Sequence, residues 1–301
     1  MRTASLYWSR VGVLALLWGS TFLWIRLALD GLRPAEVTVV RCALGALVLT
    51  AVCLARGGRL PRSAGTWRHI TVAAFFCNAL PFTLLSLGQQ SVGSGLAGLL
   101  NATTPLWSLL IGLAVGTDRA PGVLRLGGLL LGFGGTLLIF APWRHGGPAG
   151  WGALAVLGAA LSYAVAFGYM RRHLVGRGTP TLSLSAAQLL AATALTALAA
   201  PALPAGGPPP AHPGATPLIA VAVLGVLATG VTFHLTYRII ASEGATDAAA
   251  VGYLLPVVSL LLGALVLGEP LGPRTLAGMA VVLAGVAMTR LRRAPAPAGA
   301  R

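Results

Sequence analysis

One long apolar passage occurs twice in this chain, at a fixed distance along the sequence. PLWSLLIGLAVGTD begins at Pro105 and PVVSLLLGALVLGE begins at Pro256, and 256 − 105 = 151. In this register Pro105, Ser108 and Gly112 align with an identical residue, both passages end on an acidic residue, and Phe82 aligns with Phe233 outside them. Repetition of sequence this apolar is typical of membrane proteins built from two related halves.

The composition excludes a soluble protein. Hydrophobic residues make up 56% of the 301 residues and charged residues 9%, whereas a soluble domain carries about 25% charged residues. The formal net charge of +15 comes from arginines scattered through short polar gaps, and such gaps typically contact the cytoplasm and anionic lipid headgroups. We therefore expect a polytopic membrane protein whose partner is a lipid bilayer and not a nucleic acid. The three cysteines lie in apolar runs without CxxC spacing, which favours a packing role over redox or metal chemistry.

Ten apolar runs are long enough to cross a membrane as helices. A spanning helix needs about 20 mostly apolar residues, and clusters of arginine, glycine and proline separate most of the runs. The longest gap, 201–217, holds seven prolines and no charge, which predicts a solvated loop. The runs are 10–28, 36–55, 70–89, 94–116, 122–141, 150–170, 181–200, 217–239, 247–267 and 273–291.

Five spans in each half imply that the two halves enter the membrane in opposite senses. We therefore expect an inverted repeat, with one five-helix unit at 10–141 and the other at 150–291. If both termini are cytoplasmic, sixteen arginines fall on the cytoplasmic side and four on the external side. This asymmetry predicts a multi-pass protein of the inner (cytoplasmic) membrane, with an external loop at 201–217 and a cytoplasmic tail at 292–301.

An ordered set of short motifs accompanies the duplication. The first span carries WGSTF from Trp18, and the second has Pro34 followed by Arg41. Spans four and nine are centred on the repeated prolines, and spans five and ten open with the glycine-spaced patterns LGGLLLGFGG and LAGMAVVLAG. Together these motifs resemble the EamA-type branch of the drug/metabolite transporter superfamily, over roughly 10–291.

The resemblance implies an all-α bundle of ten transmembrane helices around a central cavity. In that family a five-helix unit is duplicated, and small metabolites or xenobiotics cross the membrane by alternating access. This sequence departs from a symmetric pattern at one point, because Gln188 of span seven stands where span two has Arg41. The two halves are therefore not chemically equivalent there.

The repeated prolines mark the first candidate binding site. A proline inside a helix frees the carbonyl four residues earlier, and for Pro105 and Pro256 those carbonyls belong to Asn101 and Gly252. Matched helix interruptions at mid-membrane depth point to a binding site, although a packing kink would leave the same pattern. We expect these hinges, with Asn101 and Thr104, to meet spans one, two, six and seven at a substrate cavity.

Several other polar and aromatic residues lie at depth in the spans. Arg41 faces either the bundle interior or, by snorkelling, the outer interface. We also place Trp18, Gln188 and Tyr253 on the cavity. His234 is the candidate proton relay, because the six carboxylates all lie at span ends or in loops.

These features favour a secondary transporter that exports small organic solutes. The alternatives are a translocator of lipids or isoprenoid-type molecules, a channel, or a membrane-embedded enzyme. An enzyme is disfavoured because the sequence has no paired intramembrane carboxylates, no HExxH and no GxSxG. No ATP-binding motif is present and nothing calls for a metal or cofactor. The glycines of spans five and ten allow close helix packing, within the chain or in a homodimer.

Overall fold

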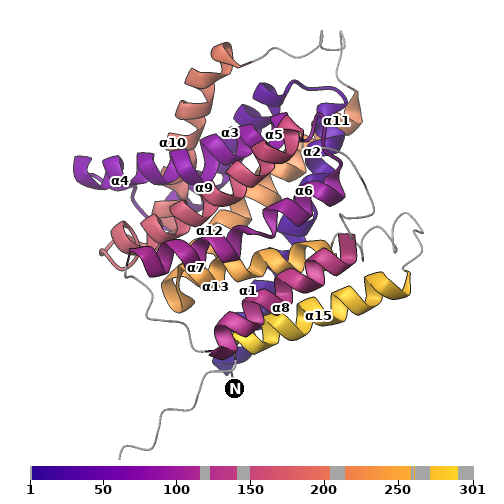
Figure 1. Ribbon diagram of the computed structural model, residues 1–301. Helices are drawn as coiled ribbons and strands as arrows, with labels where there is room; N and C mark the ends of the chain where they lie inside the picture. The colour runs from indigo at the N-terminus through magenta and orange to yellow at the C-terminus, as the bar shows by residue number, and fades with distance from the viewer. Residues whose placement is uncertain are drawn as a thin grey trace, which may run out of the picture.

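The protein is a bundle of helices (Figure 1). The computed structural model describes residues 2–115, 123–140, 150–203, 214–258, 261 and 272–290. Within these ranges seven helices are long and apolar enough to cross a membrane and three shorter helices are also apolar, and 7 + 3 = 10. An all-helical, multi-pass membrane protein is thereby confirmed. Most of the proline-rich loop and the whole C-terminal tail lie outside the described residues.

The helices of the first half begin and end close to the predicted boundaries. Helix α3 starts at Pro34, where the backbone N–H of Arg33 donates to a carboxylate oxygen of Glu36 at 2.8 Å and so caps the first turn. The elements are α1 (Arg2–Gly19), α2 (Thr21–Leu29), α3 (Pro34–Ala55), α4 (Ala64–Ala74), η1 (Phe75–Ala79), α5 (Leu80–Gly88), α6 (Ser94–Asn101), α7 (Thr104–Ala114) and α8 (Val123–Phe140).

The second half repeats this order. Its first helix, α9, ends in Arg171, Arg172 and His173, basic side chains that suit the negative end of a helix dipole. The elements are α9 (Trp151–His173), α10 (Thr181–Ala199), η3 (Ala200–Ala202), α11 (Ala215–Gly225), η4 (Val226–Val231), α12 (Thr232–Glu243), α13 (Ala245–Ala250), η5 (Val251–Tyr253) and α15 (Pro273–Arg290).

Two π-helical segments interrupt corresponding spans of the two halves. Segment η1 begins at Phe75 and η4 begins at Val226, and 75 + 151 = 226. A π-turn changes the backbone hydrogen-bond pattern. At both segments a side-chain hydroxyl donates a hydrogen bond to a nearby backbone carbonyl. Thr229 donates to the carbonyl of Leu224 at 2.8 Å, and Ser162 donates to the carbonyl of Phe76 at 2.6 Å. The sequence pattern did not predict these segments.

The spans that contain the repeated prolines are also interrupted at corresponding places. Helix α6 ends at Asn101 and α7 begins at Thr104. In the second half α13 is followed by the 3₁₀ turn η5, which contains Gly252, the residue that corresponds to Asn101 because 101 + 151 = 252. The duplication is therefore visible in the backbone as well as in the sequence.

Helices α8 and α15 pack along each other at one side of the molecule (Figure 1). Glycine makes this approach possible. A Cβ on Gly285 would lie against the backbone of Gly132 and 2.7 Å from the carbonyl oxygen of Gly128, and one on Gly278 would lie 3.0 Å from the carbonyl oxygen of Gly135. The glycine spacing of spans five and ten thus serves packing within the chain.

We expect Gly285→Ala to destabilise the fold by about 1–3 kcal/mol, because the added methyl group meets backbone that cannot turn away. Gly134→Ala is the matched control, since Gly134 lies on α8 and a Cβ there meets nothing within 4 Å. Thermal unfolding of the two purified variants compares them. Equal midpoints for both would contradict the packing described.

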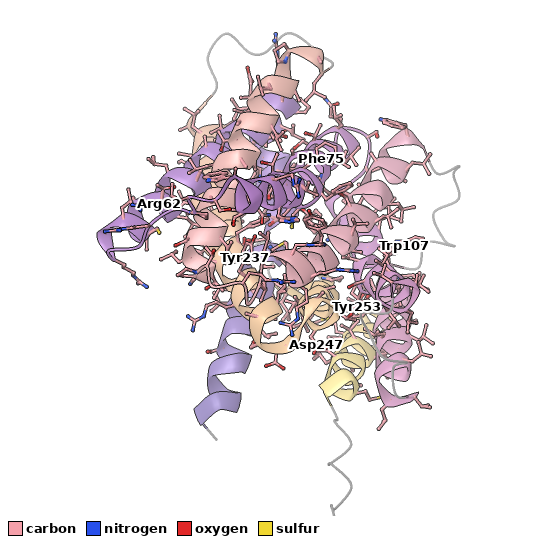
Figure 2. The ribbon with its side chains drawn as sticks, turned by 90° about the vertical axis from the view of Figure 1, so that its left-hand side faces the viewer. Arg62, Phe75, Trp107, Tyr237, Asp247 and Tyr253 are labelled. Carbon is pink, nitrogen blue, oxygen red and sulfur yellow. The ribbon has the colours of Figure 1, made fainter. Side chains whose placement is uncertain are left out.

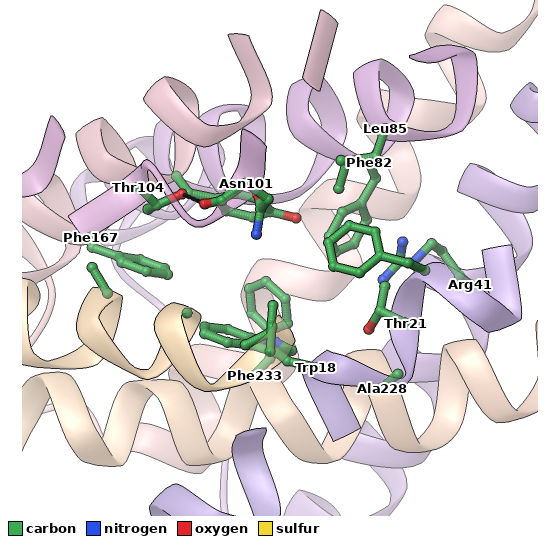
Figure 3. A pocket seen from close by; sticks show the side chains of 15 residues that line it. Trp18, Thr21, Arg41, Phe82, Leu85, Asn101, Thr104, Phe167, Ala228 and Phe233 are labelled. Carbon is green, nitrogen blue, oxygen red and sulfur yellow. Dashed lines mark hydrogen bonds between the residues drawn. The ribbon is translucent and has the colours of Figure 1, made fainter. Parts of the chain in front are cut away.

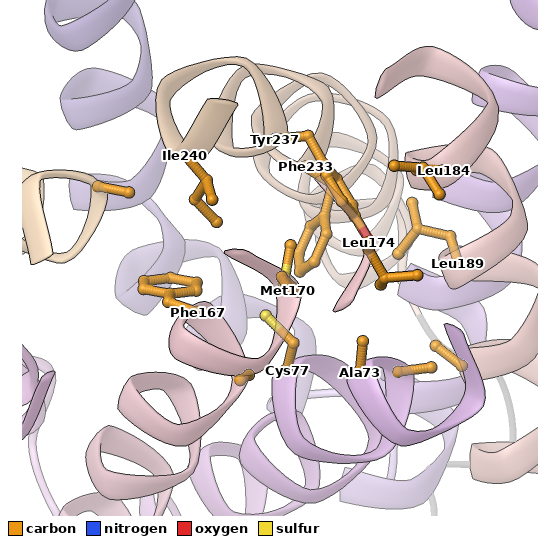
Figure 4. Packing of buried hydrophobic residues seen from close by; sticks show 14 of the residues in the cluster. Ala73, Cys77, Phe167, Met170, Leu174, Leu184, Leu189, Phe233, Tyr237 and Ile240 are labelled. Carbon is orange, nitrogen blue, oxygen red and sulfur yellow. The ribbon is translucent and has the colours of Figure 1, made fainter. Parts of the chain in front are cut away.

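Apolar side chains from many helices form the core. Figure 4 shows part of the largest cluster, in which Cys77, Met170, Phe233 and Tyr237 lie among Leu174, which follows α9, and two leucines of α10. Tyr237 lies inside the bundle, while Arg62 lies at its edge (Figure 2). All three cysteines are buried and free, which agrees with a packing role.

Candidate substrate-binding cavity

A cavity lies between the interrupted spans of the two halves (Figure 3). Its empty volume is about 570 Å3, which includes the open space at its mouth. The first half supplies Trp18, Thr21, Phe22, Arg41, Phe82, Leu85, Asn101 and Thr104. The second half supplies Tyr163, Phe167, Ala228, Phe233, Ala249, Gly252 and Leu255.

Arg41 lies on the cavity wall and is 1% exposed. Its Nε donates to the hydroxyl of Thr229 at 3.1 Å, and its guanidinium carbon lies 3.7 Å from the ring centre of Phe82. Helix α3 comes this close to α11 because Gly225 has no side chain, and a Cβ there would lie 3.1 Å from the Arg41 carbonyl oxygen. The sequence allowed Arg41 to face either the bundle interior or the outer interface, and the structure shows it inside the bundle.

Asn101 and Thr104 lie at the break between α6 and α7. The hydroxyl of Thr104 donates to the backbone carbonyl of Asn101 at 2.7 Å, so the carbonyl that Pro105 frees is occupied within the chain. The Asn101 side chain, 9% exposed, borders the cavity, and its Oδ1 is buried without a hydrogen-bond partner (Figure 3). An unpaired amide oxygen is costly to bury, which makes it a candidate acceptor for a bound molecule.

Aromatic rings make up much of the remaining wall. Trp18 stacks on Phe167 with ring centroids 6.2 Å apart, and Tyr163 lies 6.1 Å from the same ring. Phe82 and Phe233 meet edge to face at 6.1 Å. Since these two phenylalanines are repeat counterparts, the contact joins the two halves directly.

Two of the predicted cavity residues lie elsewhere. Gln188 is fully buried on α10, where its Nε2 donates to Asn78 Oδ1 at 2.7 Å and its Oε1 accepts from the hydroxyl of Tyr237. Tyr253 packs its ring against Gly132 of α8, about 3.0 Å from where a Cβ of that glycine would lie. His234 is half-buried on α12 and does not line the cavity.

Arg41 and Gln188 each lie seven residues after the first residue of α3 or α10 (41 − 34 = 7 and 188 − 181 = 7), a local offset of 147 residues, and their polar contacts also correspond. Arg41 reaches Thr229 of η4, and Gln188 reaches Asn78 of η1. Asn78 and Thr229 are counterparts, because 78 + 151 = 229. Each half therefore holds the π-helical segment of the other through a polar side chain, and only the contact made by Arg41 borders the cavity.

The set of spans that line the cavity differs from the set that the sequence predicted. Spans one, two, four, six and nine line the cavity as expected, whereas span seven contributes none of the lining residues described and spans three and eight do. Phe82 and Phe233 come from these two spans, each after a π-helical segment. A π-turn shifts the helical phase of the residues after it, and periodicity alone gives no sign of that shift.

An all-helical membrane bundle with two related halves and a cavity between them is the architecture of a membrane transporter. Among the described residues, no three His, Cys, Asp or Glu side chains gather as a metal site would require. The sequence model of the EamA-like transporter family matches residues 11–141 and again 150–291. The chain belongs to this family, which is a family of transporters and not of enzymes.

Relatives in several organisms are similar to this chain over most of its length. An uncharacterized protein of Pseudomonas aeruginosa is 33% identical over 257 residues, which cover 83% of this chain and 82% of that protein. The uncharacterized inner membrane transporter YedA of Escherichia coli (strain K12) is 26% identical over 293 residues, covering 95% and 90%. A probable terminal-alkyne amino-acid exporter of Streptantibioticus cattleyicolor is 28% identical over 300 residues, covering 97% and 95%.

A solved crystal structure has the same fold. It superposes with a TM-score of 0.76, at 23% sequence identity, over 95% of this chain and 97% of that one.

Proposed function

We propose that this protein is a secondary transporter that exports a small organic solute, with the cavity between its halves as the binding site. The observation that carries the proposal is Asn101, a buried polar side chain whose oxygen has no hydrogen-bond partner among the described residues and which borders a cavity shared by both halves. Trp18, Arg41 and Thr104 are the other proposed binding residues on the wall of this cavity.

Alternating access of two inverted halves is the proposed mechanism. Two matched contacts, one between Arg41 and Thr229 and one between Gln188 and Asn78, support this mechanism. Each contact joins one half to the π-helical segment of the other. Pro105, Pro256 and Gly252 are the proposed hinges, since they lie at or beside the matched interruptions. Any proton coupling would pass through His234.

Export as the direction is supported by a relative. The protein of Streptantibioticus cattleyicolor named above is described as a probable exporter of an amino acid. We propose that this chain also exports its solute and that the solute is about the size of an amino acid.

Reconstituted protein tests the function without a guess at the substrate. Proteoliposomes and empty liposomes are incubated with a small-molecule extract of bacterial cells. Mass spectrometry then identifies the solutes that enter the proteoliposomes and not the empty liposomes. We expect a small set of organic solutes to enter. An uptake profile equal to that of empty liposomes would reject the proposal.

We expect Asn101→Ala to lower the uptake of these solutes about fivefold, the effect of one lost hydrogen bond. The control is Gln90→Ala, which removes an exposed amide that does not border the cavity. Both variants are first checked for monodispersity and thermal stability. Uptake by Asn101→Ala at the wild-type rate would leave Asn101 with a packing role alone.

Both termini are proposed to be cytoplasmic and the loop 201–217 external. The arginine asymmetry supports this orientation. With single cysteines introduced at Ala211 or Ala298, an impermeant thiol reagent applied to intact cells should label the first and not the second. Because the native cysteines are fully buried, labelling of the wild-type protein measures the background signal. Labelling of position 298 from outside would reverse the proposed orientation.

A further inference from the structure

The cavity carries one formal charge, and that charge is positive. Arg41 is the single Arg or Lys among the fifteen lining residues described, and none of them is Asp or Glu. The rest of the wall is aromatic or aliphatic, apart from the amide of Asn101 and a few hydroxyl groups. A bound molecule therefore meets a net charge of +1 in surroundings that screen it weakly.

The guanidinium of Arg41 is only partly satisfied within the chain. It has five N–H donors, of which Nε is taken by Thr229 at 3.1 Å, and Nη1 is buried without a partner among the described residues. No described carboxylate forms an ion pair with it, and the ring centre of Phe82 lies 3.7 Å from its central carbon. Neither a hydroxyl nor a ring neutralises its charge, although buried charges in proteins are usually paired.

We infer that Arg41 binds the carboxylate of the transported solute and that the cavity selects small apolar monocarboxylates. This inference rests on the proposed function and specifies its substrate class. A guanidinium matches a carboxylate by shape and by charge-assisted hydrogen bonds. One carboxylate balances the single positive charge, whereas a dianion such as a phosphate monoester would leave a buried negative charge uncompensated.

The other parts of the wall specify the rest of the solute. The rings of Trp18, Phe167 and Phe233 contact an apolar or aromatic body. Asn101 Oδ1, which has no partner in the described part of the chain, accepts a hydrogen bond from a neutral donor such as a hydroxyl group. An ammonium group finds no anion on the described wall and would be repelled by Arg41, so the site disfavours zwitterions and cations.

Four compounds of nearly equal shape test the charge preference. Phenyllactate carries a carboxylate and a hydroxyl group, phenyllactamide is its neutral amide, phenylalanine is a zwitterion and phenylalaninol is a cation. Each competes in proteoliposomes with uptake of a solute identified in the extract assay. We expect phenyllactate to inhibit wild-type uptake at a concentration at least about tenfold lower than the other three, the contribution of a charge-assisted hydrogen bond.

Variants assign the preference to Arg41. Arg41→Gln should abolish the tenfold difference between phenyllactate and phenyllactamide, Arg41→Lys should keep part of it, and Thr229→Val, which frees Nε, should reduce it. Arg26→Gln is the matched control, because Arg26 is exposed on α2 and does not border the cavity. The wild-type comparison stands by itself if Arg41→Gln fails to fold.

Three results would overturn the inference while the transporter proposal stands. They are an equal or better inhibition by phenylalanine or phenylalaninol, no inhibition by any of the four compounds, and a carboxylate preference that survives Arg41→Gln. If instead no solute from the extract enters the proteoliposomes, the proposed function fails, and the substrate class fails with it.

Discussion

Gly252→Leu is expected to stop transport while the helical bundle stays folded. Gly252 borders the cavity on the second half, in the 3₁₀ turn that corresponds to the break after Asn101. A Cβ placed on it meets no atom within 4 Å, so the space in front of it is open. A leucine side chain therefore extends into the cavity and occupies the place of the solute, without the backbone clash that would unfold the protein.

The control for Gly252→Leu is Gly134→Leu. Gly134 is also a helical glycine with no atom within 4 Å of its Cβ position, but it is exposed on α8 and does not border the cavity. Uptake by the first variant should fall to the level of empty liposomes, and uptake by the second should equal that of wild type. Wild-type uptake by Gly252→Leu would show that solutes cross the protein by another route.

The second large effect is expected on stability, from Gln188→Leu. The Gln188 amide joins Asn78 of η1 to Tyr237 of α12 in a fully buried position. Leucine leaves the Asn78 oxygen and the Tyr237 hydroxyl without partners, and each buried orphan costs about 1–3 kcal/mol. Because polar groups within a membrane protein find other partners when it unfolds, we expect a total loss of about 2 kcal/mol.

A double-mutant cycle separates this hydrogen bond from the loss of packing. Tyr237→Phe removes one of the two orphans, so Gln188→Leu combined with Tyr237→Phe should cost less than the sum of the single changes, by about 1 kcal/mol. Gln90→Leu, at an exposed amide, should have almost no effect. Unfolding free energies in mixed micelles measure all four variants. Strict additivity would contradict a direct contact between Gln188 and Tyr237.

The positions of the spans could be predicted from the sequence because each requires a long apolar run between polar gaps. Helix α3 was expected at 36–55 and occupies Pro34–Ala55, and α9 was expected at 150–170 and occupies Trp151–His173. The family could be recognised for a related reason, since the repeated motifs and the offset of 151 residues can be read directly from the amino-acid sequence.

The detailed wall of the cavity was less predictable. The π-helical segments leave no mark on hydropathy, yet they set the direction in which Phe82 and Phe233 point. Gln188 was expected on the cavity because it takes the place of Arg41 in the second half. It lies in the core instead, because Asn78 accepts from its amide nitrogen and Tyr237 donates to its amide oxygen. Such a partnership joins residues distant in sequence and depends on tertiary structure.

A reversible block at position 252 tests directly whether solutes pass through this cavity. Gly252→Cys should transport in proteoliposomes, lose transport when a bulky apolar disulfide-forming reagent modifies the new thiol, and recover it on reduction. Wild type serves as the control, since its three cysteines are fully buried. One folded sample is thus measured open, blocked and open again. Uptake is expected to be lost on modification and fully recovered on reduction. Uptake that continues unchanged after complete modification of the introduced thiol would contradict passage through the cavity.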